Sequence, residues 1–169
     1  MTDADVSLHP QPRKVPTDEG PVLEFIRLSP DALVPFRAYG ASAAYDISAN
    51  LIGSDRRPRT ASIGSGITQT IPTGLAVRPP HGCVVLVCSR SGFATQGVFV
   101  ANAPGVLDPD YTGEIGVILT NAGLKPFYIK HGERIAQLLV IPYLACDLQE
   151  VTQFPSSGRG DRGFGSTGR

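Results

Sequence analysis

The sequence lacks a net charge. Its 15 lysines and arginines balance its 15 aspartates and glutamates. A chain without a charge excess has no overall field that attracts nucleic acid or an anionic membrane. We therefore expect neither as a partner, and any site for a polyanion must be built locally.

The sequence also has few cysteines and no long apolar run. Of its three cysteines, two stand in the apolar run 83–88. This odd number favours reduced thiols in the core over a disulfide framework. No apolar run approaches the roughly 20 residues that span a bilayer, and the N-terminus lacks a charged start followed by an apolar core. We expect an intracellular protein, cytoplasmic or nuclear and not secreted.

Long stretches free of glycine and proline are scarce. The 19 glycines and 15 prolines leave 41–52 and 143–154 as the longest such runs. These are too short for a helical bundle but ample for strands of about five or six residues. The 169 residues suffice for one domain whose core needs no disulfide or metal. We divide the chain into a flexible arm at 1–20, a β domain at 21–154 and a flexible C-terminal segment at 155–169.

Short β-prone segments recur along the middle of the chain. Strands are predicted at 22–28, within 39–49, and at 67–71, 75–77, 83–88, 117–121, 127–129, 135–141 and 148–151. Regular spacing without helical crossovers indicates an all-β fold, an antiparallel sandwich or barrel.

The acidic, aromatic stretch 105–117 is the most informative part of the sequence. Pro109 presets one backbone angle and glycines supply freedom, which predicts a twisted hairpin with a fixed tip. Such a hairpin suits a planar polar ligand, with Tyr111 stacked on the ligand or its sugar and Asp108 beside it as a general base. An ordinary aspartate-rich turn is the alternative.

Polar residues follow the strand predicted at 83–88. Arg90, Ser91 and Gly92 offer a forked donor, a hydroxyl and an unobstructed backbone N–H. A short helix beginning at Phe93 would add its positive end, so the pattern indicates a phosphate site. A helix cap with a surface arginine is the alternative.

Other polar residues stand beside apolar segments. Gln137 is the odd polar member of its strand and a candidate ligand contact, whereas Glu133 and Arg134 are interpreted as a structural pair. Asp46 is either a solvated carboxylate at a strand end or a group that holds metal or water. The arginine-rich stretch 53–60 is interpreted as a surface loop rather than a binding patch.

The segment 158–169 is too rich in glycine and polar residues to form a core. We expect it to be flexible when no ligand is bound. Its arginine, serine and threonine donors, with Phe164, suit a segment that folds over an aromatic, phosphorylated ligand. A disordered tail is the alternative.

Five of these stretches occur in one order that resembles the trimeric deoxyuridine triphosphatase family. The five motifs lie at 44–47, 90–92, 105–113, 132–137 and 159–168. The similarity spans roughly residues 22–168, and the full third and fifth motifs make it highly specific.

This resemblance implies a β jelly roll, a distorted antiparallel barrel, assembled as a homotrimer whose active sites are shared between subunits. The implied enzyme hydrolyses dUTP to dUMP and pyrophosphate, which limits uracil in DNA and supplies dUMP for dTMP synthesis. Mg²⁺ would be bound mainly through the triphosphate. Asp108 would orient and deprotonate the attacking water, and Asp46 would hold a water on the metal.

The resemblance also assigns the substrate contacts. The phosphates would be held by Arg90, Ser91, Gly92 and Gln137. Uracil would be recognised by Asn102, by the backbone of Gly105, Val106, Leu107 and Asp108, and by Gly116 nearby. Tyr111 would pack under the deoxyribose and exclude a 2′-hydroxyl. The segment 155–169 would act as a lid. Its contacts would come from Arg159, Phe164, Gly165, Ser166 and Thr167.

Three positions depart from the family pattern, and two rival functions share the scaffold. The departures are Ala44, Phe93 and Arg162, of which Arg162 is expected to alter substrate affinity. The rivals are a deoxycytidine triphosphate deaminase and a nucleotide-dependent regulatory protein. The deaminase would need a glutamate base where this chain offers Asp108.

Overall fold

The computed structural model describes residues 20–158 and 160, and this part of the chain is almost entirely β-structure. The strands are β1 (Glu24–Arg27), β2 (Ala44–Ser48), β3 (Thr60–Ile63), β4 (Thr68–Pro72), β5 (Leu75–Arg78), β6 (Cys83–Ser89), β7 (Val98–Val100), β8 (Gly105–Leu107), β9 (Gly116–Asn121), β10 (Phe127–Lys130) and β11 (Arg134–Pro142). The helix α1 spans Ser91–Ala94. The all-β prediction is confirmed, while most of the predicted arm and lid lie outside the described residues.

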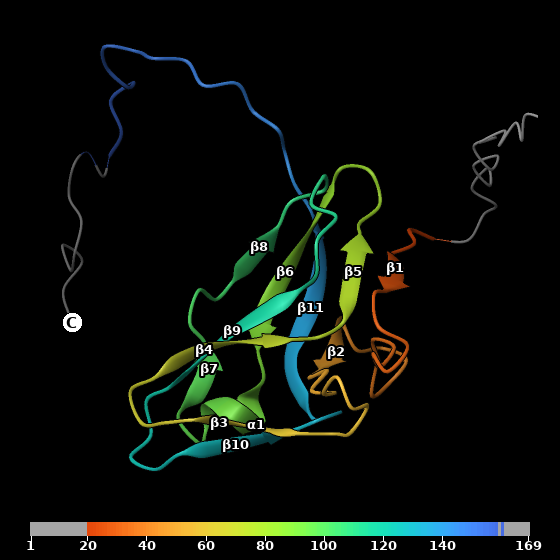
Figure 1. Cartoon of the computed structure of the whole chain (residues 1–169). Coiled ribbons are helices and arrows are strands. Elements are labelled where there is room, and N and C mark those ends of the chain that lie inside the picture. The colour runs from red at the N-terminus through yellow and green to blue at the C-terminus, as the bar shows by residue number, and fades with distance from the viewer. Residues whose placement is uncertain (1–19, 159, 161–169) are drawn as a thin grey trace, which may run out of the picture.

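The strands pair antiparallel in several sheets (Figure 1). One sheet has the order β2-β11-β6-β8 and another β4-β9-β7, with the smaller pairs β1-β5 and β10-β3 beside them. Aliphatic side chains from both larger sheets form one buried cluster, including Val85 and Leu138 from the first and Ile71 and Leu119 from the second. This is the layered arrangement expected of an antiparallel β fold.

The helix α1 closes one end of this core. Its Phe93 is buried, and the Phe93 and Phe127 rings meet edge to face with centroids 4.9 Å apart. The helix starts at Ser91, two residues before its predicted start, and directly follows β6 and Arg90. The polar sequence after β6 is therefore anchored by an aromatic contact on its buried side.

The predicted hairpin at 105–117 is wrong. Strand β8 pairs with β6, whereas β9 pairs with β4 and β7, so the two strands belong to different sheets. The connection between them does turn, since Tyr111 N donates to Asp108 O at 3.0 Å. After this turn the connection does not return to β8. It contacts β5 instead, where Ile115 N donates to Leu75 O at 2.8 Å.

The predicted strand at 148–151 is also wrong. Residues 143–158 form no strand, and Leu148 is fully exposed at 101%. An apolar sequence forms a strand only where another strand supplies hydrogen-bond partners, and this segment leaves the body of the chain (Figure 1). Two short strands, β3 and β7, were not predicted.

The loop before β3 lies on the surface, as predicted, with residues 54–60 exposed. Ion pairs join Arg56 to Asp31 and Arg59 to Asp55. The backbone N–H of Arg57 donates to the Asp55 carboxylate at 3.2 Å, which lowers the pKa of Asp55.

The cysteines are less deeply buried than predicted. Cys83 and Cys88 are half-buried, Cys146 is exposed, and all three are free. The interpretation as core thiols is wrong because β6 lies between β11 and β8 with only alternate side chains fully covered. Among residues 20–158, no helix has the length and apolar character needed to cross a membrane.

Candidate functional site

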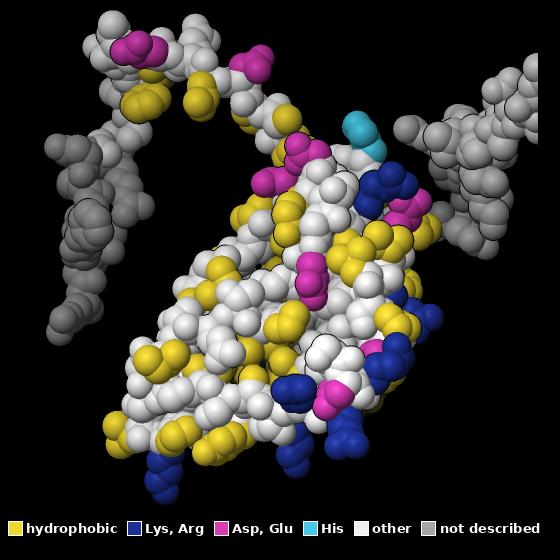
Figure 2. Space-filling view, viewed as in Figure 1, with side chains coloured by type: hydrophobic (Ala, Val, Ile, Leu, Met, Phe, Trp, Pro, Cys, Tyr) yellow, Lys and Arg dark blue, Asp and Glu magenta, His cyan; other side chains and the backbone are white. Residues whose placement is uncertain are grey.

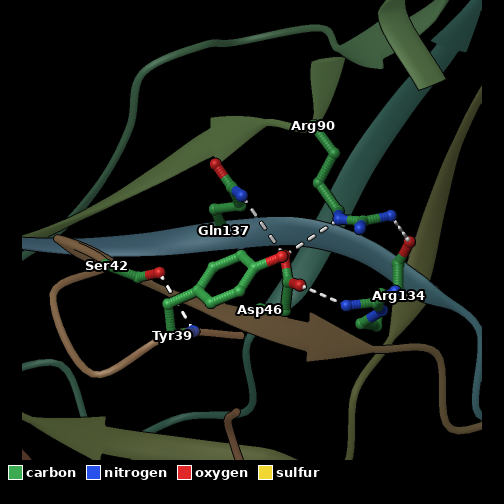
Figure 3. A network of polar contacts seen from close by, with 6 residues as sticks. All are labelled: Tyr39, Ser42, Asp46, Arg90, Arg134 and Gln137. Carbon is green, nitrogen blue, oxygen red and sulfur yellow. Dashed lines mark hydrogen bonds and ion pairs between the residues drawn. The ribbon is translucent and has the colours of Figure 1, made fainter. Parts of the chain in front are cut away.

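Asp46 is a buried carboxylate at the centre of a polar cluster (Figure 3). The Asp46 cluster consists of Asp46, Arg90, Arg134 and Gln137. Asp46 is 7% exposed; Arg90 Nε and Gln137 Nε2 donate to its Oδ1 at 2.9 and 3.3 Å, and Arg134 Nη1 donates to Oδ2 at 2.9 Å. A carboxylate this deeply buried stays charged only with such partners. The alternative of a solvated strand-end carboxylate is therefore wrong.

The backbone of Asp46 is fixed on two sides. Its N–H donates to Phe36 O at 2.7 Å, and its carbonyl accepts from Phe36 N at 3.0 Å. On the other side β2 pairs with β11, where Asp46 lies opposite Gln137. The position of the carboxylate therefore follows from main-chain contacts rather than from a loop.

An irregularity in β11 brings Arg134 to the same carboxylate. Asp46 pairs with Gln137 and Ile47 with Ala136, but Ser48 pairs with Arg134, so the register shifts at Ile135. In a regular strand, residues three apart point to opposite faces. The extra residue turns Arg134 onto the face that carries Gln137, which is what a β-bulge does.

Arg90 joins the cluster from the end of β6. Its Nη1 donates to Arg134 O at 3.0 Å, and its side chain is 21% exposed. It is the N-cap residue of α1, as the alternative predicted, but its side chain makes no cap bond and contacts Asp46 instead of lying free on the surface. No group among the described residues accepts a bond from Nη2.

Ser91 and Gly92 lie exposed just beyond Arg90. The carbonyl of Gly92 accepts from Thr95 Oγ1 at 3.2 Å and from Gln96 Nε2 at 2.9 Å. These two bonds hold the turn that presents the serine hydroxyl and the glycine backbone to solvent.

Residues 100–107 lie beside the same end of β6. Val100 N donates to Ser89 Oγ at 2.9 Å, and Gly105 pairs with Val87. A Cβ at Gly105 would lie 3.1 Å from Asn102 Nδ2, so the absence of a side chain at position 105 leaves room for the Asn102 amide. Val106 is 58% exposed and Leu107 half-buried, leaving one face of β8 open.

Asp108 and Tyr111 occupy the turn that follows β8. Asp108 is exposed, and Tyr111 is 47% exposed with its hydroxyl donating to Glu114 O at 2.9 Å. Glu114 in turn accepts from Gly74 N at 2.7 Å through Oε1. The turn is thus tied, through Glu114, to the connection between β4 and β5.

The predicted site residues are therefore only partly brought together. Hydrogen bonds join Arg90 and Gln137 to Asp46. The segment that contains Asn102 and Gly105 lies beside β6, because Gly105 pairs with Val87. Gly116 begins β9 in the other large sheet, opposite Pro72. The predicted lid contacts Arg159, Phe164, Gly165, Ser166 and Thr167 lie outside the described residues, as does Arg162.

Arg134 is the residue that the sequence did not assign to the site. The predicted pair of Glu133 with Arg134 is wrong, because Glu133 Oε2 accepts from Lys130 N at 3.0 Å while Arg134 turns to Asp46. The spacing of three between Arg134 and Gln137 indicates opposite faces of a strand, and no local signal in the sequence marks the bulge.

The described residues hold no group of three or more His, Cys, Asp or Glu side chains placed to bind a metal ion. An ionised carboxylate offers about four lone-pair sites. Three of the sites on Asp46 accept hydrogen bonds, from Arg90, Arg134 and Gln137. The remaining site suits one water on a metal held mainly by a ligand, and not a site built by protein alone.

Comparison with known proteins places these features in one family. A sequence model described as dUTPase matches residues 31–168. Over 143 residues the chain is 43% identical to the deoxyuridine 5′-triphosphate nucleotidohydrolase of Dictyoglomus turgidum, covering 84% of this chain and 95% of that protein. A protein of the same name from Anaeromyxobacter is 45% identical over 115 residues, which are 68% of this chain and 78% of that protein.

A solved structure shares the fold. The dUTPase of Staphylococcus bacteriophage 80alpha with dUpNHpp superposes with a TM-score of 0.76 at 29% identity, covering 88% of this chain and 99% of that one.

Proposed function

The chain belongs to the dUTPase family and is a hydrolase acting on dUTP, and we propose that it performs this reaction at a site formed by β2, β6, β8, β11 and the turn after β8. The observation that carries this placement is the Asp46 cluster. It fixes Arg90 with an unused edge of its guanidinium, next to the strand that supports Asn102 and Gly105. A polyanion and a planar base could thus be bound a short distance apart.

The phosphates of dUTP are bound at the end of β6. Arg90 supplies the free edge of its guanidinium, Ser91 its hydroxyl and Gly92 its backbone N–H. Gln137 adds an amide from β11. Guanidinium groups form strong, directional bonds with phosphate oxygens, so a fixed Arg90 also sets the orientation of the chain of phosphates.

Mg²⁺ bound through the triphosphate would supply charge neutralisation at the phosphate oxygens. On the protein, Asp46 would hold one water of the metal through its remaining lone pair. The donor count around Asp46 fits this role, since three of its sites are taken by Arg90, Arg134 and Gln137.

Asp108 is the general base. It accepts a proton from the attacking water as the water oxygen forms a bond to phosphorus. The bond between that phosphorus and the oxygen bridging the α- and β-phosphates breaks, which gives dUMP and pyrophosphate. Its exposed position after β8 leaves room for both water and substrate.

Uracil is recognised by Asn102 and by the backbone of 105–108. Tyr111 packs under the deoxyribose and leaves no room for a 2′-hydroxyl, which rejects UTP by exclusion. The segment 155–169 closes over the bound nucleotide, with contacts from Arg159, Phe164, Gly165, Ser166 and Thr167.

The active enzyme is a homotrimer with sites shared between subunits. Residues 143–158 support this proposal, because they leave the body of the chain with several apolar side chains uncovered (Figure 2). Leu144 is 89% exposed, Leu148 101% and Phe154 86%. An exposed apolar surface of this kind marks an interaction site.

The test is pyrophosphate release from dUTP, with UTP, dTTP and dCTP measured in parallel. Rapid release from dUTP alone, dependent on Mg²⁺, is expected. Asp108→Asn should lower kcat about 10²–10⁴-fold, the usual contribution of a positioned base, while KM changes little. A chain ending at Ser157 should lose the same activity. Full activity of Asp108→Asn would assign the base to another residue.

A further inference from the structure

Arg134 lies in the Asp46 cluster without an assigned role in dUTP binding. On the premise of the function proposed above, we propose that Arg134 is a positioning residue for the phosphate site, acting through Asp46 and Arg90.

The contacts link Arg134 to Arg90 in two ways. The Arg134 side chain donates to Asp46 Oδ2 at 2.9 Å, which leaves Oδ1 to accept from Arg90 Nε. The Arg134 carbonyl accepts from Arg90 Nη1 at 3.0 Å. Two nitrogens of the Arg90 guanidinium, Nε and Nη1, are therefore held by groups that Arg134 contacts or provides, and Nη2 has no acceptor among the described residues.

The charge balance gives the Arg134 side chain a second effect. With Arg90 alone, the buried Asp46 carboxylate would cancel the positive charge that the phosphates need. A second guanidinium on the other carboxylate oxygen leaves the cluster with a net positive charge. Asp46 is 7% exposed and the Arg90 side chain 21%, so solvent screens these two charges less than the Arg134 guanidinium, which is 47% exposed and adds its charge at short range to a bound polyphosphate.

The bulge in β11 indicates that this arrangement is specific. A regular ladder would turn Arg134 to the opposite face, where neither Asp46 nor Arg90 is reached. The Arg134 side chain is 47% exposed, so its position is set by the ion pair with Asp46 rather than by burial.

The experiment uses inorganic pyrophosphate as a probe of the phosphate site, measured by calorimetric titration, together with KM and kcat for dUTP. Arg134→Gln should bind pyrophosphate about tenfold more weakly and raise KM about tenfold, with kcat within about twofold of the unmodified enzyme. Arg134→Lys keeps the charge and should recover binding to within about threefold. If Gln at this position prevents folding, Arg134→Met, which keeps the aliphatic stem, replaces it.

The matched control is Arg56→Gln, which removes the same charge from an exposed ion pair with Asp31. It should leave pyrophosphate binding, KM and kcat unchanged. The proposal is overturned if the uncharged variants bind pyrophosphate as tightly as the unmodified enzyme, if their loss is confined to kcat, or if Arg134→Lys binds as weakly as Arg134→Gln. Failure of the unmodified chain to hydrolyse dUTP would instead refute the proposed function, and the pyrophosphate titration would still decide the role of Arg134.

Discussion

At the scale of single residues, the missing side chain at Gly113 determines where the Tyr111 ring lies. A Cβ at position 113 would be 2.5 Å from Tyr111 Oη and 2.6 Å from Cζ. The hydroxyl donates to Glu114 O, so the ring is held at its tip. Because these atoms are the far end of a side chain, an added methyl group would displace the ring without disturbing a strand.

We therefore expect Gly113→Ala to weaken the rejection of UTP while the fold is kept. The ratio of kcat/KM for dUTP to that for UTP should fall about tenfold, equivalent to about 1.4 kcal/mol. Tyr111→Phe keeps the ring and removes only the hydroxyl, so it should retain the ratio to within about threefold. An unchanged ratio in Gly113→Ala would argue that the Tyr111 ring does not exclude the 2′-hydroxyl.

Single residues were predictable where their chemistry is local. Arg90, Ser91 and Gly92 follow an apolar run in the sequence, and they lie directly after β6 as this pattern predicts. The partners of Asp46 were not predictable. They come from β6 and β11, at separations of 44, 88 and 91 residues, and the bulge that turns Arg134 has no sequence signature.

At the scale of elements, the short strand β8 is positioned by its pairing with β6. Gly105 is buried against Val87 of β6, and a Cβ there would be 3.4 Å from Val87 Cβ as well as 3.1 Å from Asn102 Nδ2. The strand thus joins the proposed uracil contacts to the strand that ends at the proposed phosphate site.

Gly105→Ala should separate these two parts of the site. The methyl group would displace the Asn102 amide, and we expect KM for dUTP to rise roughly fivefold, in line with a weakened neutral hydrogen bond. The affinity for inorganic pyrophosphate should stay the same, because the Asp46 cluster is not touched. Steady-state kinetics and the pyrophosphate titration measure the two effects. An equal loss of both affinities would mean that the substitution distorts β6 itself.

The strand pattern also shows what sequence periodicity leaves open. Alternation of apolar residues located most strands to within a few residues, because one face of each strand lies in the core. It did not identify the partner of β8, since a turn with proline and glycine serves equally well between strands of one sheet or of two. Residues 148–151 had the composition of a strand but pair with no strand among residues 20–158.

At the scale of the whole molecule, the apolar side chains along 143–158 are the strongest sign that a single chain is incomplete. Leu144, Leu148 and Phe154 are each more than four-fifths exposed. Burying one leucine contributes about 1.5–3 kcal/mol, and in the proposed homotrimer each such contact occurs three times. One substitution should therefore remove three contacts from the assembly.

We expect Leu148→Asp to dissociate the assembly and to lower dUTP hydrolysis with it, because the proposed active sites are shared between subunits. Light scattering during gel filtration should change from the mass of three chains toward that of one. Leu124→Asp is the matched control: this leucine is 95% exposed in the connection between β9 and β10, so the same charge there should leave mass and turnover unaltered. If Leu148→Asp remains a trimer with full activity, residues 143–158 do not hold the subunits together, and the contact must be sought on the exposed apolar residues of β1, Phe25 and Ile26.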